Sequence, residues 1–256
     1  MRSGIHRAAA VGFDRAAGAY ELGRASYPAA AVGAILAVTG ATPSRTLLEL
    51  GAGTGKLTRE LVASGARVLA LEPVAGMREV LAHNAPGAEP LDAVAEAIPL
   101  ADASVDAVIA AQSFHWFDPV AATDEVARVL QPGGAVALIW NRRDERVAWV
   151  RELSRILDGR AGDAPRYRTG LWRRGFDANP AFAPLELETW AHRGARGREI
   201  VLARVASISF VAALEEEPRA QLLAEVADLL DAHPDTRGRD DLSLPYVTEL
   251  FTTQRA

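Results

Sequence analysis

The stretch LLELGAGTGKL, from Leu47 to Leu57, decides the fold of this 256-residue chain. It places one carboxylate, Glu49, within a run of apolar residues and then three glycines (Gly51, Gly53 and Gly55) in five positions. The apolar run is typical of a buried strand, and the glycines permit a tight turn with positive φ. Because a strand that leads through such a turn into a helix brings backbone N–H groups close to a ligand, the stretch predicts a nucleotide-type binding element.

Three known glycine elements compete for this pattern. A phosphate-binding P-loop has a longer glycine loop that ends in Gly-Lys-Ser/Thr, whereas Lys56 is followed here by Leu57. The dinucleotide fingerprint Gly-x-Gly-x-x-Gly fits Gly51 and Gly53 but finds Lys56 at its third glycine. The remaining pattern, Glu-x-Gly-x-Gly-x-Gly, begins at Glu49 and has every residue that it requires.

Apolar runs of strand length alternate with helical patterns on both sides of the glycine stretch. Strands are predicted at residues 46–50, 66–73, 105–112, 133–141, 185–193 and 242–253, and helices at residues 29–39, 56–65, 74–84 and 119–130, with two more within 199–231. This alternation predicts an α/β fold, a Rossmann-like, mostly parallel sheet with helices on both faces.

The chain is expected to form one domain in four parts. The Arg-rich third part lacks a strand–helix pattern, which predicts a cap or insertion after strand five, and its Trp149 and Trp172 favour a partly apolar pocket. The parts are 1–28 (an N-terminal lid), 29–141 (a ligand-binding core), 142–184 (the cap) and 185–256 (C-terminal strands and helices).

Composition excludes several function classes. The chain has no cysteine, which excludes disulfides, Cys-ligated zinc and thiolate nucleophiles. Its net charge of −5 argues against electrostatic attraction to nucleic acid or an anionic membrane. No Asp/His cluster has metal-ligand spacing, and no run approaches the ~18 apolar residues of a membrane span. We therefore expect a cytoplasmic protein without a metal, a nucleic-acid partner or membrane contact.

Four further features follow the glycine motif in a fixed order. Glu72 ends the second apolar run, where a carboxylate can accept hydrogen bonds from two ribose hydroxyls. The segments AEAIPL, VDAVIAAQSFHWF and RVLQPGGAVAL come next. With them, residues 13–141 resemble the class I S-adenosylmethionine (SAM)-dependent methyltransferases, and within these the type 11 group, near the trans-aconitate-methyltransferase-like small-molecule enzymes. The opening FDRAAGAYELGRASYP and the signature FHWF support that placement.

The resemblance implies a seven-stranded sheet, SAM as methyl donor and S-adenosylhomocysteine (SAH) as product. Glu49 would bond the loop backbone or act through its charge on the sulfonium of SAM. Many relatives carry Asp where Val94 stands, so adenine recognition would rest on the backbone of Ala95 and on Glu96. The implied cofactor-binding residues are Glu49, Gly51, Ala52, Gly53, Gly55, Glu72, Pro73, Ala95, Glu96, Gln112 and, in the lid, Arg24.

His115 and Tyr20 are the candidate catalytic residues. His115 follows the fourth strand at the sheet edge where ligands bind, and an imidazole with a pKa of about 6.5 can accept a substrate proton there. The alternative is a histidine with a structural hydrogen bond. The resemblance places Tyr20 near the methyl group, and Arg24 on the methionine carboxylate of SAM.

The expected substrate pocket comprises Tyr27, Phe114, Trp116, Trp140 and Arg142. Phe114 and Trp116 would either wall this pocket or belong to the core. Arg142 and Arg143 would either bind an acidic substrate or lie on the surface without a specific role.

The expected reaction is an in-line displacement that carries the methyl group of SAM to a small-molecule acceptor. The protein need only align the groups and exclude water, and a base is required only for a nucleophile that holds its proton tightly. The alternatives are a protein or RNA methyltransferase and a non-catalytic SAM-binding regulatory module, while Lys56 disfavours an NAD-dependent enzyme. We expect a monomer or homodimer; O-, N- and C-methylation all stay open.

Overall fold

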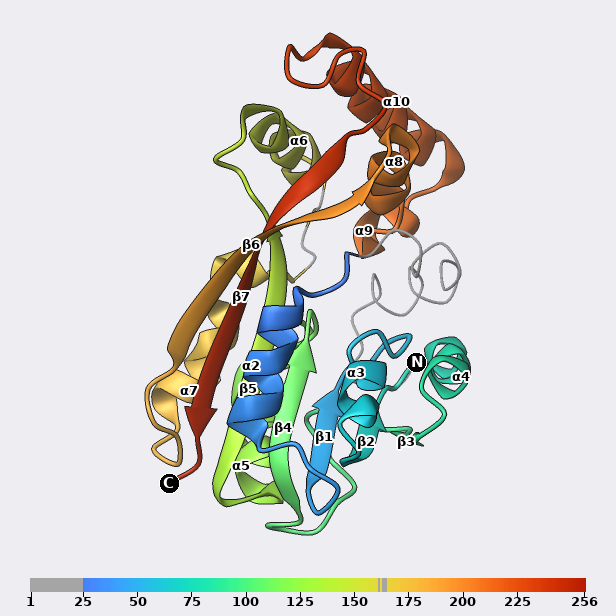
Figure 1. The fold of residues 1–256 in the computed structure, drawn as a ribbon. Helices are drawn as coiled ribbons and strands as arrows, with labels where there is room; N and C mark the ends of the chain where they lie inside the picture. Colours follow the sequence, from blue (N-terminus) through green and yellow to red (C-terminus); the bar gives the residue numbers. More distant parts are fainter. Residues whose placement is uncertain (1–24, 161, 163–164) are drawn as a thin grey trace.

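The computed structural model describes residues 25–160, 162 and 165–256, and it confirms the predicted seven-stranded, mostly parallel sheet (Figure 1). The strand order is β3-β2-β1-β4-β5-β7-β6. Strands β1 to β5 run parallel, and β7 runs antiparallel to both of its neighbours. The strands are β1 (Thr46–Leu50), β2 (Arg67–Leu71), β3 (Ala88–Leu91), β4 (Val105–Ala111), β5 (Leu130–Arg143), β6 (Glu186–Arg196) and β7 (Ser243–Gln254).

Helices cover both faces of the sheet, as the alternating pattern predicts. Successive residues of β1 point to opposite faces: Leu47 packs in one apolar cluster with α2 and the residues around α3, and Leu48 packs in another with α5 and α7. The helices of this part are α2 (Ala29–Thr39), α3 (Thr58–Ala63), α4 (Ala75–Asn84), α5 (Pro119–Val129) and α7 (Arg174–Ala178), with the 3₁₀ turn η1 (Phe114–Trp116).

A third apolar cluster lies beyond the carboxyl ends of the parallel strands (Figure 1). It joins α6 (Ala148–Asp158), α8 (Arg198–Ala206), α9 (Ser209–Ala212) and α10 (Glu216–Ala232) to the first half of β7. We call this group of helices the cap cluster. It stands over the sheet edge where ligands bind in open α/β folds. Two helices are predicted between β6 and β7, and the structure has three, because α8 ends at Ala206 and the separate short helix α9 begins at Ser209.

The two tryptophans of the segment after β5 are buried rather than exposed to a pocket. Trp149 is 5% exposed and packs in the cap cluster, and Trp172 is 3% exposed and packs on the sheet against Phe251. The two tryptophans therefore line neither cavity of the candidate active site, because each fills an apolar face, and the partly apolar pocket itself stays a prediction. Tyr167, in the 3₁₀ turn η2 (Tyr167–Thr169), lines one of these cavities instead; the next turn is η3 (Leu171–Arg173).

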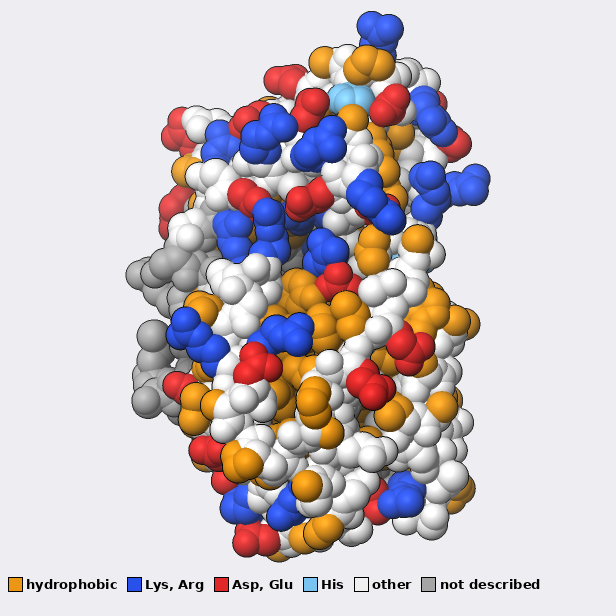
Figure 2. Space-filling model, turned by 90° about the vertical axis from the view of Figure 1, so that its left-hand side faces the viewer, with side chains coloured by type: hydrophobic (Ala, Val, Ile, Leu, Met, Phe, Trp, Pro, Cys, Tyr) orange, Lys and Arg blue, Asp and Glu red, His pale blue; other side chains and the backbone are white. Residues whose placement is uncertain are grey.

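Charged side chains of both signs are mixed on the surface. On the face shown in Figure 2, basic and acidic side chains alternate over the upper half, and apolar side chains occupy the middle. The surface salt bridges that join such groups include Arg160 with Glu225 and Arg198 with Asp231.

Candidate active site

The glycine turn after β1 has the backbone geometry that requires glycine. Gly51, Gly53 and Gly55 have φ values of +64°, +60° and +85°. A Cβ on Gly51 would lie 2.7 Å from the Cβ of Ser113, whereas a Cβ on Gly53 would meet no atom within 4 Å. Gly51 thus allows close packing against the end of β4, and Gly53 leaves open space for a ligand.

Two buried carboxyl groups flank this turn. The hydroxyl of Thr58 donates a hydrogen bond of 2.6 Å to Glu49 Oε2, and burial raises the pKa of Glu49 to about 8, with the nearby Glu72 adding to the shift. Glu72 accepts hydrogen bonds of 2.9 Å from the backbone N–H groups of Gly53 and Val74. Burial also raises the pKa of Glu72. Glu72 therefore holds the glycine turn in place, and Glu49 is largely uncharged at pH 7.

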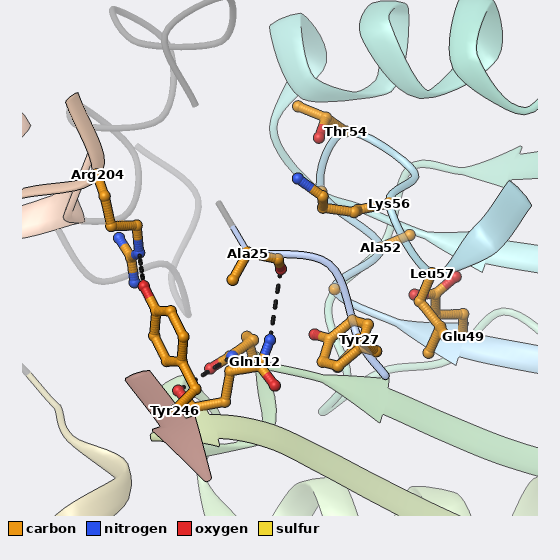
Figure 3. A pocket seen from close by; sticks show the side chains of 14 residues that line it. Ala25, Tyr27, Glu49, Ala52, Thr54, Lys56, Leu57, Gln112, Arg204 and Tyr246 are labelled. Atoms are coloured by element: carbon orange, nitrogen blue, oxygen red, sulfur yellow. Dashed lines mark hydrogen bonds between the residues drawn. The ribbon is translucent and has the colours of Figure 1, made fainter. Parts of the chain in front are cut away.

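A first cavity of about 50 Å³ lies against the glycine turn (Figure 3). Gln112 borders it and has a φ of +58°, an uncommon value for a residue other than glycine. Asn141, at the end of β5, donates to the backbone oxygen of Ser26 and accepts from the Thr248 hydroxyl, so it fixes the chain that enters α2. The cavity is lined by Ala25, Tyr27, Glu49, Gly51, Ala52, Gly53, Thr54, Lys56, Leu57, Ala111, Gln112, Asn141, Arg204 and Tyr246.

A second, larger cavity of about 190 Å³ adjoins the first. Its aromatic wall is formed by Trp116, Trp140 and Tyr167, and the rings of Trp140 and Tyr167 lie 4.7 Å apart. The two cavities share four lining residues: Gln112, Asn141, Arg204 and Tyr246. The two cavities therefore adjoin one another at these four residues.

His115 lines the second cavity, and its ring is oriented by a tryptophan. The indole N–H of Trp140 donates to His115 Nδ1 over 3.2 Å, so a neutral His115 carries its proton on Nε2. Nδ1 already accepts a hydrogen bond, and Nε2 of the neutral ring carries the proton, so neither nitrogen is placed to remove a proton from a substrate. This geometry favours the alternative of a structural hydrogen bond for His115.

Arg142 lies in the second cavity but is neutralised there. Its guanidinium forms an ion pair of 2.7 Å with the buried Glu249, which also accepts a hydrogen bond from the Tyr167 hydroxyl. The sequence-based suggestion that Arg142 binds an acidic substrate therefore lacks support, because the Glu249 carboxylate occupies it.

The structure brings most predicted site residues to these cavities but not all of them. Phe114 is fully buried against Phe176, so of its two expected places it takes the one in the core. Ala95 is also buried in the core. Glu96 accepts a hydrogen bond of 2.8 Å from the backbone N–H of Asp118, so its oxygen is engaged within the protein. The predicted site residues that the structure describes and that line neither cavity are Gly55, Glu72, Pro73, Ala95, Glu96 and Phe114.

Two predicted residues, Tyr20 and Arg24, lie outside the part of the chain that the structure describes, as does most of the expected lid. Conversely, Arg204 and Tyr246 border both cavities but are missed by the sequence reasoning. They come from α8 and β7, far along the chain, and carry no local motif. Within the described ranges, no helix is long and apolar enough to cross a membrane, and no group of His, Asp and Glu could hold a metal ion.

Comparison with known proteins agrees with this geometry. A family model described as a methyltransferase domain matches residues 48–138. An uncharacterized methyltransferase of Mycobacterium tuberculosis is 42% identical, with 92% of each chain covered. An uncharacterized methyltransferase-like protein of Schizosaccharomyces pombe is 33% identical, again with 92% of each chain covered.

Solved structures share the same architecture. A putative type II methyltransferase from Anaeromyxobacter dehalogenans is 26% identical, with a TM-score of 0.62 over 91% of this chain and 97% of that one. A geranyl diphosphate methyltransferase in complex with SAM is 15% identical, with a TM-score of 0.52 over 89% of this chain and 85% of that one. The second likeness concerns the fold alone.

Proposed function

Because this chain belongs to the type 11 group of SAM-dependent methyltransferases, we propose that it carries the methyl group of SAM to a small-molecule acceptor at the border of its two cavities. The observation that carries this proposal is the set of four residues shared by the cavities, Gln112, Asn141, Arg204 and Tyr246. A donor bound against the glycine turn and an acceptor bound in the second cavity would face one another there. Such alignment is the main contribution that a protein makes to a displacement reaction.

The residues around the first cavity fit SAM. The open space at Gly53 accommodates a ligand against the backbone, and the Glu49 carboxyl borders the same cavity. Glu72 lines neither cavity, but its two oxygens accept the backbone N–H groups of Gly53 and Val74 and so hold the turn against which the ribose of SAM would lie. When bound, SAM supplies a methyl group on a positively charged sulfur, which is a good leaving group.

The residues of the second cavity position the acceptor and exclude water. The rings of Trp116, Trp140 and Tyr167 give an apolar wall, and His115 is held in one orientation by Trp140. A neutral His115 carries its proton on Nε2, so this side chain would donate a hydrogen bond to the methyl acceptor rather than remove a proton from it. The cavity volume of about 190 Å³ and the net charge of −5 favour a small molecule over RNA or protein.

Calorimetric titration with SAM, SAH and NAD tests the donor, and transfer of labelled methyl groups from SAM to a panel of small molecules tests the reaction. We expect micromolar binding of both adenosyl ligands, no binding of NAD, and label in at least one small molecule. Binding of NAD in place of SAH would contradict the proposal. Label that accumulates only in added protein or RNA would support the alternative class of acceptor.

A further inference from the structure

The second cavity contains more positive charge than its carboxylates neutralise. Among the described residues, five arginines line it (Arg142, Arg143, Arg166, Arg168 and Arg204), together with two carboxylates (Glu145 and Asp158). Three of these arginines form ion pairs. Arg142 pairs with Glu249, which lies behind the wall, and Arg166 and Arg168 both pair with Asp158. Glu145 also pairs with Arg168. In the described part of the chain, Arg143 and Arg204 form no ion pair with a carboxylate, and Asp158 and Glu145 act on Arg143 only from farther away.

Arg143 and Arg204 form hydrogen bonds only to neutral groups among these residues. Arg143 Nε donates to the Ser154 hydroxyl over 2.9 Å. Arg204 donates to the hydroxyls of Tyr246 and Ser207, each over 3.2 Å. Hydroxyl groups satisfy single donors but do not offset a full positive charge inside a protein. Several N–H donors of both guanidinium groups thus remain for another acceptor.

The two guanidinium groups lie near one another because β7 links them. Arg143 stands opposite Tyr246 in the ladder between β5 and β7, and the Tyr246 hydroxyl accepts the hydrogen bond from Arg204 (Figure 3). Burial, with a smaller contribution from the charge of Arg204, lowers the pKa of Arg143 to about 10, while Tyr246, Asp158 and Glu145 act in the opposite direction. Arg143 is therefore still charged at neutral pH, so the positive charges of Arg143 and Arg204 repel one another in a partly buried cavity. An anionic ligand would relieve that repulsion.

We propose that Arg143 and Arg204 bind a carboxylate group of the methyl acceptor, so that the acceptor is an organic carboxylic acid. This inference rests on the proposed function and names its substrate class. The planar donors of a guanidinium match the two oxygens of a carboxylate. The aromatic wall opposite, with Trp140 and Tyr167, suits an apolar or planar remainder of the same molecule.

Arg143 allows acceptor binding to be distinguished from the binding of SAM, because SAM also has a carboxylate. Arg204 lines both cavities, whereas Arg143 lines only the second one. Loss of Arg143 therefore affects acceptor binding and leaves the donor site intact. Arg155 offers a matched control, because it is an exposed arginine on α6 outside both cavities.

The test is calorimetric titration of SAH-saturated protein with benzoate, succinate and citrate, and with benzamide, succinamide and inorganic phosphate as comparisons. We expect at least one carboxylate to bind, and its amide or phosphate to bind at least tenfold more weakly. Arg143→Gln should weaken that carboxylate about tenfold or more, in line with the loss of a charged hydrogen bond. SAH affinity should change less than twofold, Arg143→Lys should recover part of the loss, and Arg155→Gln should behave as wild type.

Three outcomes would overturn the inference: no carboxylate binds, the amide or phosphate binds equally well, or folded Arg143→Gln and Arg143→Lys both bind the carboxylate as wild type does. Circular dichroism melting curves establish that each variant is folded. If SAH itself does not bind to the wild type, the proposed function fails first. If SAH binds but the carboxylates do not, only the present inference fails.

Discussion

At the scale of single residues, burial decides which charges this site presents. Glu49 and Glu72 are both buried carboxyl groups next to the same turn, yet their surroundings differ. Glu72 accepts two backbone N–H groups, which oppose the effect of burial on its pKa. Glu49 has the Thr58 hydroxyl as its donor, and its pKa rises to about 8. The motif carboxylate that appears negative in the sequence is therefore largely protonated before a ligand binds.

This difference predicts how stability depends on pH. The pKa of Glu49 is 4.5 as a free group and about 8 in the folded protein, so between these values the folded state holds a proton that the unfolded state releases. The free energy of unfolding of wild type should therefore fall as pH rises through this window, by up to about 1.4 kcal/mol per pH unit from this group. Glu49→Gln should lack that part of the slope. Urea unfolding at several pH values from 5 to 8 measures this change of the free energy of unfolding with pH. The same pH dependence in wild type and Glu49→Gln would contradict the prediction.

Glu72 leads to a second prediction at this scale. Glu72→Gln keeps the shape but replaces one acceptor oxygen by an NH₂ group that faces a backbone N–H of Gly53 or Val74. We expect the free energy of unfolding to fall by about 1–3 kcal/mol and SAH affinity to fall about 10- to 100-fold. Melting curves and calorimetry measure these effects. Glu89→Gln, at an exposed carboxylate paired with Arg67, is the control and should leave SAH affinity unchanged.

At the scale of elements, the glycine turn separates folding from binding. Gly51 and Gly53 have nearly equal positive φ values, so alanine at either position costs about 1–2 kcal/mol of backbone strain. Only at Gly51 does the added Cβ meet a neighbour, at 2.7 Å from Ser113. Gly51→Ala should thus lose about 1–3 kcal/mol more stability than Gly53→Ala, which should fold well and bind SAH more weakly. Equal melting temperatures for the two variants would contradict this reasoning.

The elements that the sequence predicts well are those whose packing follows from local pattern. The helix at residues 29–39 and the strand at 46–50 agree with α2 and β1, since each carries a continuous apolar signal. Strand β3 is harder to recognise, because its four residues include an exposed Glu89 and a proline. It owes its place in the sheet to pairing with β2 rather than to its own composition.

The same distinction holds within the site. The glycine turn and its two carboxyl groups could be predicted because they follow one another along a strand, a turn and a second strand. Arg204 and Tyr246 could not, because α8 reaches the site through the cap cluster and β7 through its antiparallel pairing with β5. The pairing of Arg142 with Glu249 likewise depends on the antiparallel ladder between β5 and β7, which no local pattern reveals. The sequence therefore points equally to Arg142 and Arg143 for an acidic substrate, whereas the structure pairs Arg142 with Glu249 and places Arg204 beside Arg143.

At the scale of the whole molecule, the apolar interior is divided between the two sheet faces and the cap cluster. The glycine turn rests on the sheet, Arg204 is positioned by the cap cluster, and Tyr246 belongs both to that cluster and to the ladder between β5 and β7. The active site lies where these parts meet, so donor binding should depend mainly on the sheet and acceptor binding on both. The narrower placement near the trans-aconitate-methyltransferase-like enzymes stays a prediction about that acceptor.

Two cavity-forming substitutions of the same kind test this division. Leu48 in β1 and Leu222 in α10 are both fully buried, so alanine at either should lower the free energy of unfolding by about 2–5 kcal/mol. At a temperature where both variants are folded, Leu48→Ala should weaken SAH binding more than Leu222→Ala, because Leu48 precedes Glu49 and the turn. Leu222→Ala should weaken the binding of a carboxylate to the SAH complex more than that of SAH itself, because α10 supports α8 and hence Arg204. Melting curves and calorimetry on both variants measure these effects, and equal losses of SAH and carboxylate affinity in both would show that the sheet and the cap cluster respond as one unit.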